Sequence, residues 1–286
     1  MNSNAYILKI MAQKITTPIK FITLLFIATF SLIFIGMSLD NETLIKAGFI
    51  LIPAVLVLFV VTLVILPGIK ARKAFEKFAM ERNLMIEKTP NLDKNIVNVF
   101  SRNNPYSMEK RSILQKTKNL LFTHDNVYIF FNTQSIYGGG VNELQEHLCF
   151  LFQILKHQNG YHVITMDDRP FANKLYKGVI AFASDAMKID NNFIKIGIPE
   201  IDDKYSISST NKEEIIDMLP QIKKSLIDIK DIFSGFSIPR GDIDYKMSNI
   251  VIDISGQYCL VRMDHNYAVY LEQIYPLIIE LSNSFR

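Results

Sequence analysis

Cysteine is scarce in this chain: Cys149 and Cys259 are the only two among 286 residues. They lie far apart, and neither belongs to a C-x-x-C pair, so the spacing does not support a zinc site. The composition therefore excludes a cysteine-rich metal fold and a disulfide framework. We predict no metal and no cofactor.

An excess of one charge is also missing. Lysine and arginine total 31 against 28 aspartates and glutamates, and from residue 68 onward the two signs number 27 and 26. No Lys/Arg cluster with interleaved aromatic residues is present. A nucleic-acid surface needs such a cluster, so we expect no nucleic-acid partner.

Recognisable catalytic motifs are absent as well. None of the five histidines lies in an H-E-x-x-H pattern. The tract Gly138-Gly139-Gly140 is followed by Val-Asn-Glu-Leu instead of the G-K-[ST] of a phosphate loop. We interpret these glycines as a flexible connection between strands, with a glycine-lined contact surface as the alternative. The sequence favours a protein that is not an enzyme.

One weak catalytic candidate can be named. His162 alternates with Ile164 and Met166 along an expected strand, and Asp167 and Asp168 follow it closely. A histidine base oriented by a carboxylate is possible at this spacing. A histidine packed in a strand, followed by ordinary polar residues at the strand end, explains the same pattern.

Two long apolar runs stand out in what the chain does contain. Residues 21–37 and 47–67 hold no charged side chain. A helix of about 20 apolar residues spans the hydrocarbon core of a bilayer. The sequence therefore predicts a transmembrane helical hairpin, and with it an integral two-pass membrane protein in contact with the lipid bilayer.

Basic residues beside the two runs predict its orientation. The first run follows Lys14 and Lys20, and the second precedes Lys70, Arg72 and Lys73. Because positive flanks stay on the cytoplasmic side, both termini are expected in the cytoplasm. Both cysteines would then lie in a reducing compartment as free, buried thiols.

The rest of the chain divides by pattern. Residues 1–67 form the N-terminal flank and hairpin, 68–104 a juxtamembrane stalk helix and linker, and 105–286 a cytosolic domain. The stalk carries an apolar stripe that includes Phe75 and Phe78, typical of a helix that packs on one face. Asn-Asn-Pro at 103–105 marks the boundary.

Alternating apolar residues predict several strands in the last domain. Asn159-Gly160 suggests a tight hairpin turn, because both residues tolerate positive φ, and Ser255-Gly256 suggests another. The expected strands are 120–123, 127–132, 148–156, 161–166, 179–183, 193–198, 205–208, 243–247, 250–254 and 258–263.

Three helices are expected among these strands. Asp168-Arg-Pro170 begins a short one to about residue 176. Thr210-x-x-Glu213 has the spacing of a capping box ahead of a helix to about 235, and a terminal helix covers 267–284. Hairpins of strands with helices between them predict an α+β fold with a mainly antiparallel sheet and flanking helices.

The stretch 193–219 resembles uncharacterised two-pass bacterial inner-membrane proteins that carry a cytosolic domain of unknown function. The resemblance lies in an apolar strand, then Tyr205-Ser-Ile-Ser-Ser, then a helix ending in Met218-Leu219-Pro220. It implies a bacterial inner membrane and carries over no catalytic residue.

These observations favour a membrane-anchored cytosolic binding or regulatory domain, with a protein partner or a second copy of the chain as its target. Two alternatives stay open. One is a membrane-tethered hydrolase that uses His162 with Asp167 or Asp168. The other is a bacterial effector whose hairpin inserts into a host membrane.

Overall fold

A computed structural model describes residues 24–103, 110–114, 116–138, 141–166, 205–234 and 250–285. The chain divides into two compact units. One unit comprises Met1–Lys73 with Gly235–Asp244, and the other comprises Ala74–Ser234 with Tyr245–Arg286.

Two helices in the first unit pack closely against each other. A helix over residues 24–38 is followed by α2 (Glu42–Val60), and Asn41 caps the start of α2 by accepting from the backbone N–H of Thr43 at 3.1 Å. Gly48 permits the close approach of these two helices. A Cβ atom on Gly48 would lie 2.3 Å from Ile33 Cγ1.

These helices correct the membrane prediction. The second apolar run is divided among α2, the π-helical segment η1 (Val61–Ile65) and α3 (Leu66–Glu81), and α2 itself begins with Glu42 and includes Lys46. In the described residues, no helix is both long enough and apolar enough to cross a membrane.

The predictions of a transmembrane hairpin and of an integral, two-pass localisation are therefore wrong. Insertion into a bacterial or host membrane was inferred from the same hairpin, and that prediction is wrong as well. The orientation drawn from the flanking charges has no basis either. Lys70, Arg72 and Lys73 lie on α3, and Lys14 and Lys20 lie outside the described residues.

The second unit is built on an antiparallel sheet, which confirms the α+β class. Its described strands run in the order β1–β4–β5–β6–β7, with β8 paired to β6. A separate small sheet pairs β2 with β3. The strands are β1 (Ile86–Glu87), β2 (Ser101–Asn103), β3 (Lys110–Ser112), β4 (Lys116–Phe122), β5 (Val127–Gly138), β6 (Val141–Met166), β7 (Tyr205–Ser209) and β8 (Ile250–Asp264).

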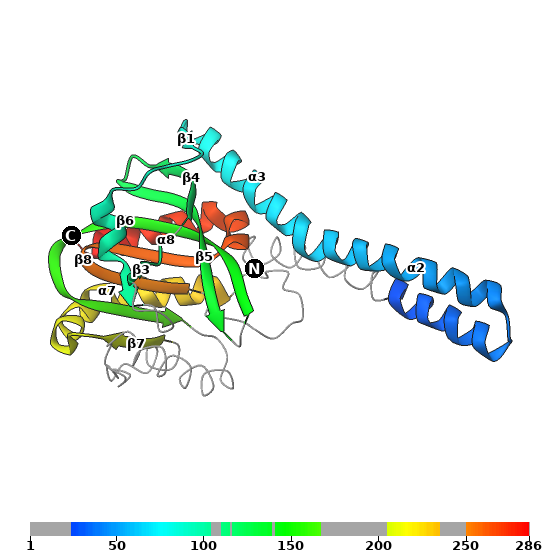
Figure 1. Cartoon of the computed structure of the whole chain (residues 1–286). Helices are drawn as coiled ribbons and strands as arrows, with labels where there is room; N and C mark the ends of the chain where they lie inside the picture. Colours follow the sequence, from blue (N-terminus) through cyan, green and yellow to red (C-terminus); the bar gives the residue numbers. More distant parts are fainter. Residues whose placement is uncertain are drawn as a thin grey trace, which may run out of the picture. The chain divides into compact units, whose positions relative to one another are not determined.

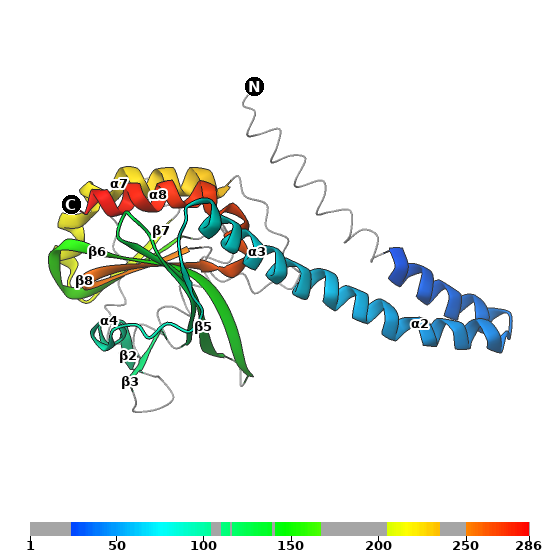
Figure 2. The same ribbon diagram turned by 90° about the horizontal axis from the view of Figure 1, so that it is seen from above.

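Different elements cover the two faces of this sheet (Figures 1 and 2). The helices α7 (Lys212–Ser234) and α8 (Leu271–Ser284) lie side by side on one face, which we call the helix face. The short helix α4 (Lys94–Val99) and the β2–β3 pair lie on the other, which we call the α4 face. Both faces bury apolar side chains, with Phe150 and Ile229 on the first and Phe130 and Leu151 on the second.

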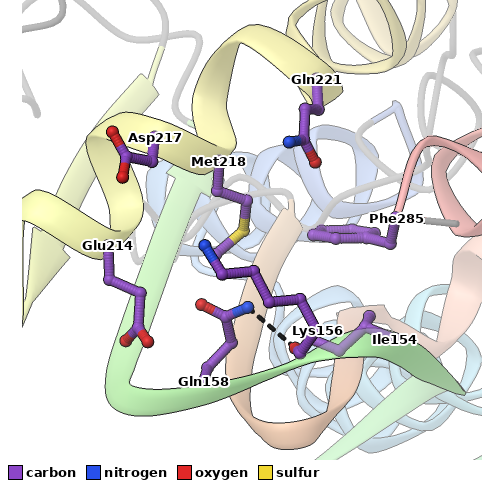
Figure 3. Close-up of a pocket in the computed structure, with 8 residues that line it drawn as sticks. All are labelled: Ile154, Lys156, Gln158, Glu214, Asp217, Met218, Gln221 and Phe285. Atoms are coloured by element: carbon purple, nitrogen blue, oxygen red, sulfur yellow. Dashed lines mark hydrogen bonds between the residues drawn. The ribbon is translucent and has the colours of Figure 1, made fainter.

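Two predicted hairpins are instead two long strands that pair with each other. Neither Asn159 nor Gly160 has a positive φ, and β6 continues through them as one strand that bends there (Figure 3). Gln153 pairs with Tyr258 and Tyr161 with Ser255, so β6 advances eight positions along this stretch while β8 advances three. Gly256 has φ 58° at this irregularity, as the glycine of a bulge does, and β8 continues through it without a hairpin turn.

Several local predictions are confirmed. Asn126, with φ 60°, sits in the turn between β4 and β5, and Thr123 N–H donates to the Val127 carbonyl. The helix expected after Thr210 is α7, and the terminal helix is α8, preceded by a 3-10 segment η2 (His265–Tyr270). The strands expected at 179–183, 193–198 and 243–247, and the helix at 168–176, lie outside the described residues.

Both cysteines are free and buried, as expected. Cys149 pairs in register with Arg262 and belongs to the cluster under α4. Cys259 pairs with Phe152, whose side chain points to the helix face next to Phe285. The two thiols thus lie on opposite faces of the sheet, and burial raises the pKa of each.

The C-terminal half of α3 packs into the second unit. Phe75 and Phe78 are each 1 % exposed, and their rings lie 4.8 Å from Phe131 and 5.3 Å from Tyr275. Arg82 extends this contact through two hydrogen bonds to the carboxylate of Glu272, at 2.7 and 2.6 Å. The boundary near residue 105 stays a prediction.

Candidate functional site

A chain of three polar side chains joins β6, β7 and α7 on the helix face. His162 follows the bend of β6 and pairs in register with Ser209, the last residue of β7. Asn211 then turns the chain into α7 and accepts from the N–H of Glu214 at 3.4 Å. This geometry brings Glu214, in the first turn of α7, back over the bend of β6.

Both ring nitrogens of His162 have partners. Nδ1 lies 2.6 Å from Ser209 Oγ, and Nε2 lies 3.1 Å from Glu214 Oε2. Glu214 also accepts from the backbone, taking the N–H of Asn159 on Oε1 at 2.9 Å and that of Gly160 on Oε2 at 2.7 Å. These two N–H groups face α7 because the bend of β6 withdraws them from the sheet.

The glycine at the bend is required by this packing. A Cβ atom on Gly160 would lie 2.8 Å from both Asn211 Cβ and His162 Cε1, and 3.0 Å from Glu214 Oε2. Any larger residue would therefore push α7 away from β6.

The surroundings determine the protonation states. Burial lowers the pKa of His162, and the opposing attraction of Glu214 does not restore it. Burial would raise the pKa of Glu214, but the backbone N–H groups of Asn159 and Gly160, with His162, bring it below its usual value. At neutral pH, Glu214 is a carboxylate and His162 is neutral, so Nε2–H donates to Glu214 and Nδ1 can accept from the Ser209 hydroxyl.

The order serine–histidine–carboxylate is that of a hydrolytic triad, but the surroundings of the serine differ. Ser209 and His162 are both fully buried. Ser209 Oγ also accepts from Asn211 N at 2.9 Å and lies 2.6 Å from the Asn211 carbonyl, which competes with His162 for its one proton. A nucleophile needs a free approach to its oxygen, and three polar contacts already surround this one.

The residues named from the sequence have different outcomes. His162 does contact a carboxylate, but it is that of Glu214, and Asp167 and Asp168 lie outside the described residues. Gly138 ends β5 and pairs with Val141, while Gly139 and Gly140 also lie outside the described residues.

Ser209 and Glu214 were missed from the sequence. The signal that could have found them is the capping pattern at the start of α7. The spacing in the sequence predicted it at Thr210 and Glu213, one residue too early. In the structure Asn211 caps α7, and Glu214 is the acidic residue that joins His162.

A second polar group lies on the α4 face. Asp253 is fully buried on β8, accepts from Arg262 Nε at 2.8 Å and accepts from the Tyr161 hydroxyl at 2.8 Å. His147 lies near this ion pair, and burial, followed by the charge of Arg262, lowers its pKa to about 3. Among the described residues, no group of three or more His, Cys, Asp or Glu side chains could hold a metal ion.

Comparisons with known proteins add little. No protein-family model matches the chain, and neither does any curated protein. Among solved structures, the chain is similar to the crystal structure of the mycobacterial trehalose monomycolate transport factor A, TtfA, at 10 % sequence identity and a TM-score of 0.38. The match covers 77 % of this chain and 94 % of that one. A likeness at this level carries no argument about function.

Proposed function

We propose that this chain is a non-enzymatic binding or regulatory protein, and that the Ser209–His162–Glu214 chain is a structural clasp. The observation that carries the proposal is that the hydrogen-bonding atoms of these three side chains are all engaged. Every polar atom that could do chemistry there already bonds to a neighbour inside the fold. Buried polar groups that are fully satisfied fix one arrangement of the elements that carry them.

The clasp reinforces other polar contacts between the same elements, since β6 and β7 are already paired strands. Tyr161 N–H donates to Thr210 Oγ1 at 2.8 Å, and Thr210 N–H donates back to the Tyr161 carbonyl at 3.1 Å. Glu214 also accepts from the two preceding backbone N–H groups, those of Asn159 and Gly160. Together these bonds anchor the start of α7 to the bend of β6. This anchoring holds the exposed beginning of α7 in a defined position.

A hydrolase is the second candidate, favoured by the order of the three groups alone. It requires Ser209 to become exposed and its bonds with Asn211 to break. A fluorophosphonate probe, which labels activated serines, distinguishes the two functions. We expect no labelling of the full chain and no turnover of a p-nitrophenyl ester. Labelling that Ser209→Ala abolishes, while Ser208→Ala does not, would establish the hydrolase.

A further inference from the structure

Asn159 and Gly160 form the only asparagine–glycine pair in the sequence, and they lie at the bend of β6. Asn159 is exposed, whereas Gly160 is buried against the start of α7. An exposed asparagine followed by glycine is prone to deamidation, because glycine has no side chain to hinder attack by its backbone nitrogen. The pair therefore carries a reaction that needs no enzyme.

This reaction is a ring closure between a side chain and the backbone. The backbone nitrogen of Gly160 loses its proton and attacks Cγ of Asn159, and the side-chain nitrogen leaves as ammonia. Water then opens the succinimide at either of its two carbonyls, which gives aspartate or isoaspartate. A water molecule is consumed for each ammonia released, and nothing is oxidised or reduced.

Glu214 opposes the first step. Its Oε2 accepts from the backbone N–H of Gly160 at 2.7 Å, and its Oε1 accepts from that of Asn159 at 2.9 Å. Figure 3 shows the Glu214 side chain pointing from α7 toward the bend of β6. A carboxylate beside an N–H group disfavours loss of that proton, because the nitrogen anion and the carboxylate repel each other. While Glu214 is in place, the nitrogen of Gly160 keeps its proton and is not a nucleophile.

The packing of the bend opposes ring closure as well. Closure needs rotations about the bonds of Asn159 that bring its Cγ onto the next nitrogen, and Asn159 is held within a strand. Tyr161 fixes the chain directly after the pair through its strand pairing. A Cβ atom on Gly160 would lie 2.8 Å from both Asn211 Cβ and His162 Cε1, so the backbone has little room to move.

We propose that Asn159 is a deamidation site that the clasp protects, and that its deamidation makes release of the start of α7 permanent. In isoaspartate the backbone runs through the former side chain and gains a methylene group. The close packing around Gly160 cannot absorb this added length, so its N–H no longer meets Glu214. The inference requires only the geometry of the clasp and stands apart from the proposed binding function.

The test follows deamidation in the full chain at pH 7.5 by mass spectrometry of the tryptic peptide that begins at His157. The folded chain is compared with the same chain unfolded in urea. A clasp that is open about 0.1–10 % of the time should slow deamidation of Asn159 about 10- to 1,000-fold. Equal rates in the folded and unfolded chains would overturn the protection.

Two variants attribute the protection to one side chain. Glu214→Ala removes the acceptor of both backbone N–H groups and should speed deamidation about tenfold or more in the folded chain. Glu213→Ala changes the adjacent, exposed carboxylate and should leave the rate unchanged.

Circular dichroism establishes that each variant is folded. If Glu214→Ala unfolds, Glu214→Gln replaces it, because glutamine keeps the length and one acceptor oxygen but loses the charge. We then expect an intermediate rate. A folded Glu214→Gln variant that deamidates as slowly as the parent chain would overturn the role of the carboxylate.

Amide hydrogen exchange tests whether the release is permanent. The isoaspartyl protein is separated by ion exchange, and its Gly160 N–H should exchange faster than in the unmodified chain. Asn159→Asp is the matched control, because it adds the charge without the extra methylene group, and its Gly160 N–H should exchange more slowly than that of the isoaspartyl form. Equally slow exchange in the isoaspartyl and unmodified chains would overturn the permanent release.

Discussion

The two faces of the sheet treat their buried polar groups differently. On the helix face, His162 has a partner on each ring nitrogen, and those partners are themselves bonded. On the α4 face, His147 bonds the backbone of Met263, but its Nε2 has no partner among the described residues. Asn132 pairs in register with His147, and its buried Oδ1 finds no partner in the part of the chain that the structure describes.

The difference shows two ways of placing polarity inside one sheet. On the helix face, the ionised carboxylate of Glu214 accepts from the neutral His162 and from two backbone N–H groups. The buried Oε1 of Gln158, on the same side, has no partner among the described residues. The α4 face uses a charged pair, Asp253 with Arg262, whose Asp253 carboxylate is fully buried, and leaves neutral acceptors nearby unmet. We therefore expect the ion pair to contribute most to the stability of the α4 face, and the clasp to contribute most to the stability of the helix face.

The largest effect is expected at the ion pair. Asp253→Ala leaves Arg262 charged and buried without its partner, which should lower the free energy of unfolding by about 3–5 kcal/mol. Urea denaturation measures this. The double variant Asp253→Leu with Arg262→Met should cost much less than the single one. A double variant that costs as much as both singles together would show that the charges do not depend on each other.

The clasp should give an intermediate effect. His162→Gln should lower the free energy of unfolding by about 0.5–3 kcal/mol, because Ser209 and Glu214 lose a buried partner. In a double-mutant cycle with Glu214→Gln, we expect a coupling of about 0.5–3 kcal/mol, as for residues in one network. Strictly additive losses would mean that the two side chains act separately.

The histidines should also make stability depend on pH. Folding lowers the pKa of both His147 and His162, that of His147 to about 3, while an unfolded histidine titrates near 6.5. The unfolded chain then binds more protons, so stability is complete above about pH 6.5 and is lost as the pH falls toward 3.

Each histidine contributes at most about 1.4 kcal/mol per pH unit to this slope. His147→Gln should flatten the slope, and at pH 7.5 it should cost only the bond to the backbone of Met263, since Nε2 has no partner within the described residues. His124→Gln, the same substitution at an exposed turn, is the matched control. An unchanged slope in His147→Gln would contradict the buried, neutral state of this histidine.

The smallest effect concerns the cysteines, where the two faces should behave alike. Burial and a raised pKa keep both thiols protonated, so native protein should resist iodoacetamide at pH 8. Mass spectrometry should find both alkylated only after unfolding in urea. Rapid labelling of Cys149 alone would show that the α4 face opens more readily than the helix face.

Some features of this protein follow from neighbours in the sequence. The β4–β5 turn at Asn126, the helix that ends near Ser234 and the terminal helix could all be predicted. The antiparallel α+β class and the two buried thiols could be predicted as well. Turn residues, caps and apolar periodicity act over a few positions, and those positions are visible in the sequence.

Other features were decided only by contacts between distant segments. Asn159-Gly160 has the composition of a hairpin turn, yet it lies inside β6 because Glu214, more than 50 positions later, takes both backbone N–H groups. His162 was visible as a candidate, but Ser209 and Glu214 became its partners through the pairing of β7 and the cap of α7. The apolar runs suggested spanning helices, and the division of the second run among three helical segments was not visible in its composition. Composition describes what each residue can do, whereas the long-range pairing of strands and helices determines which of those possibilities is used.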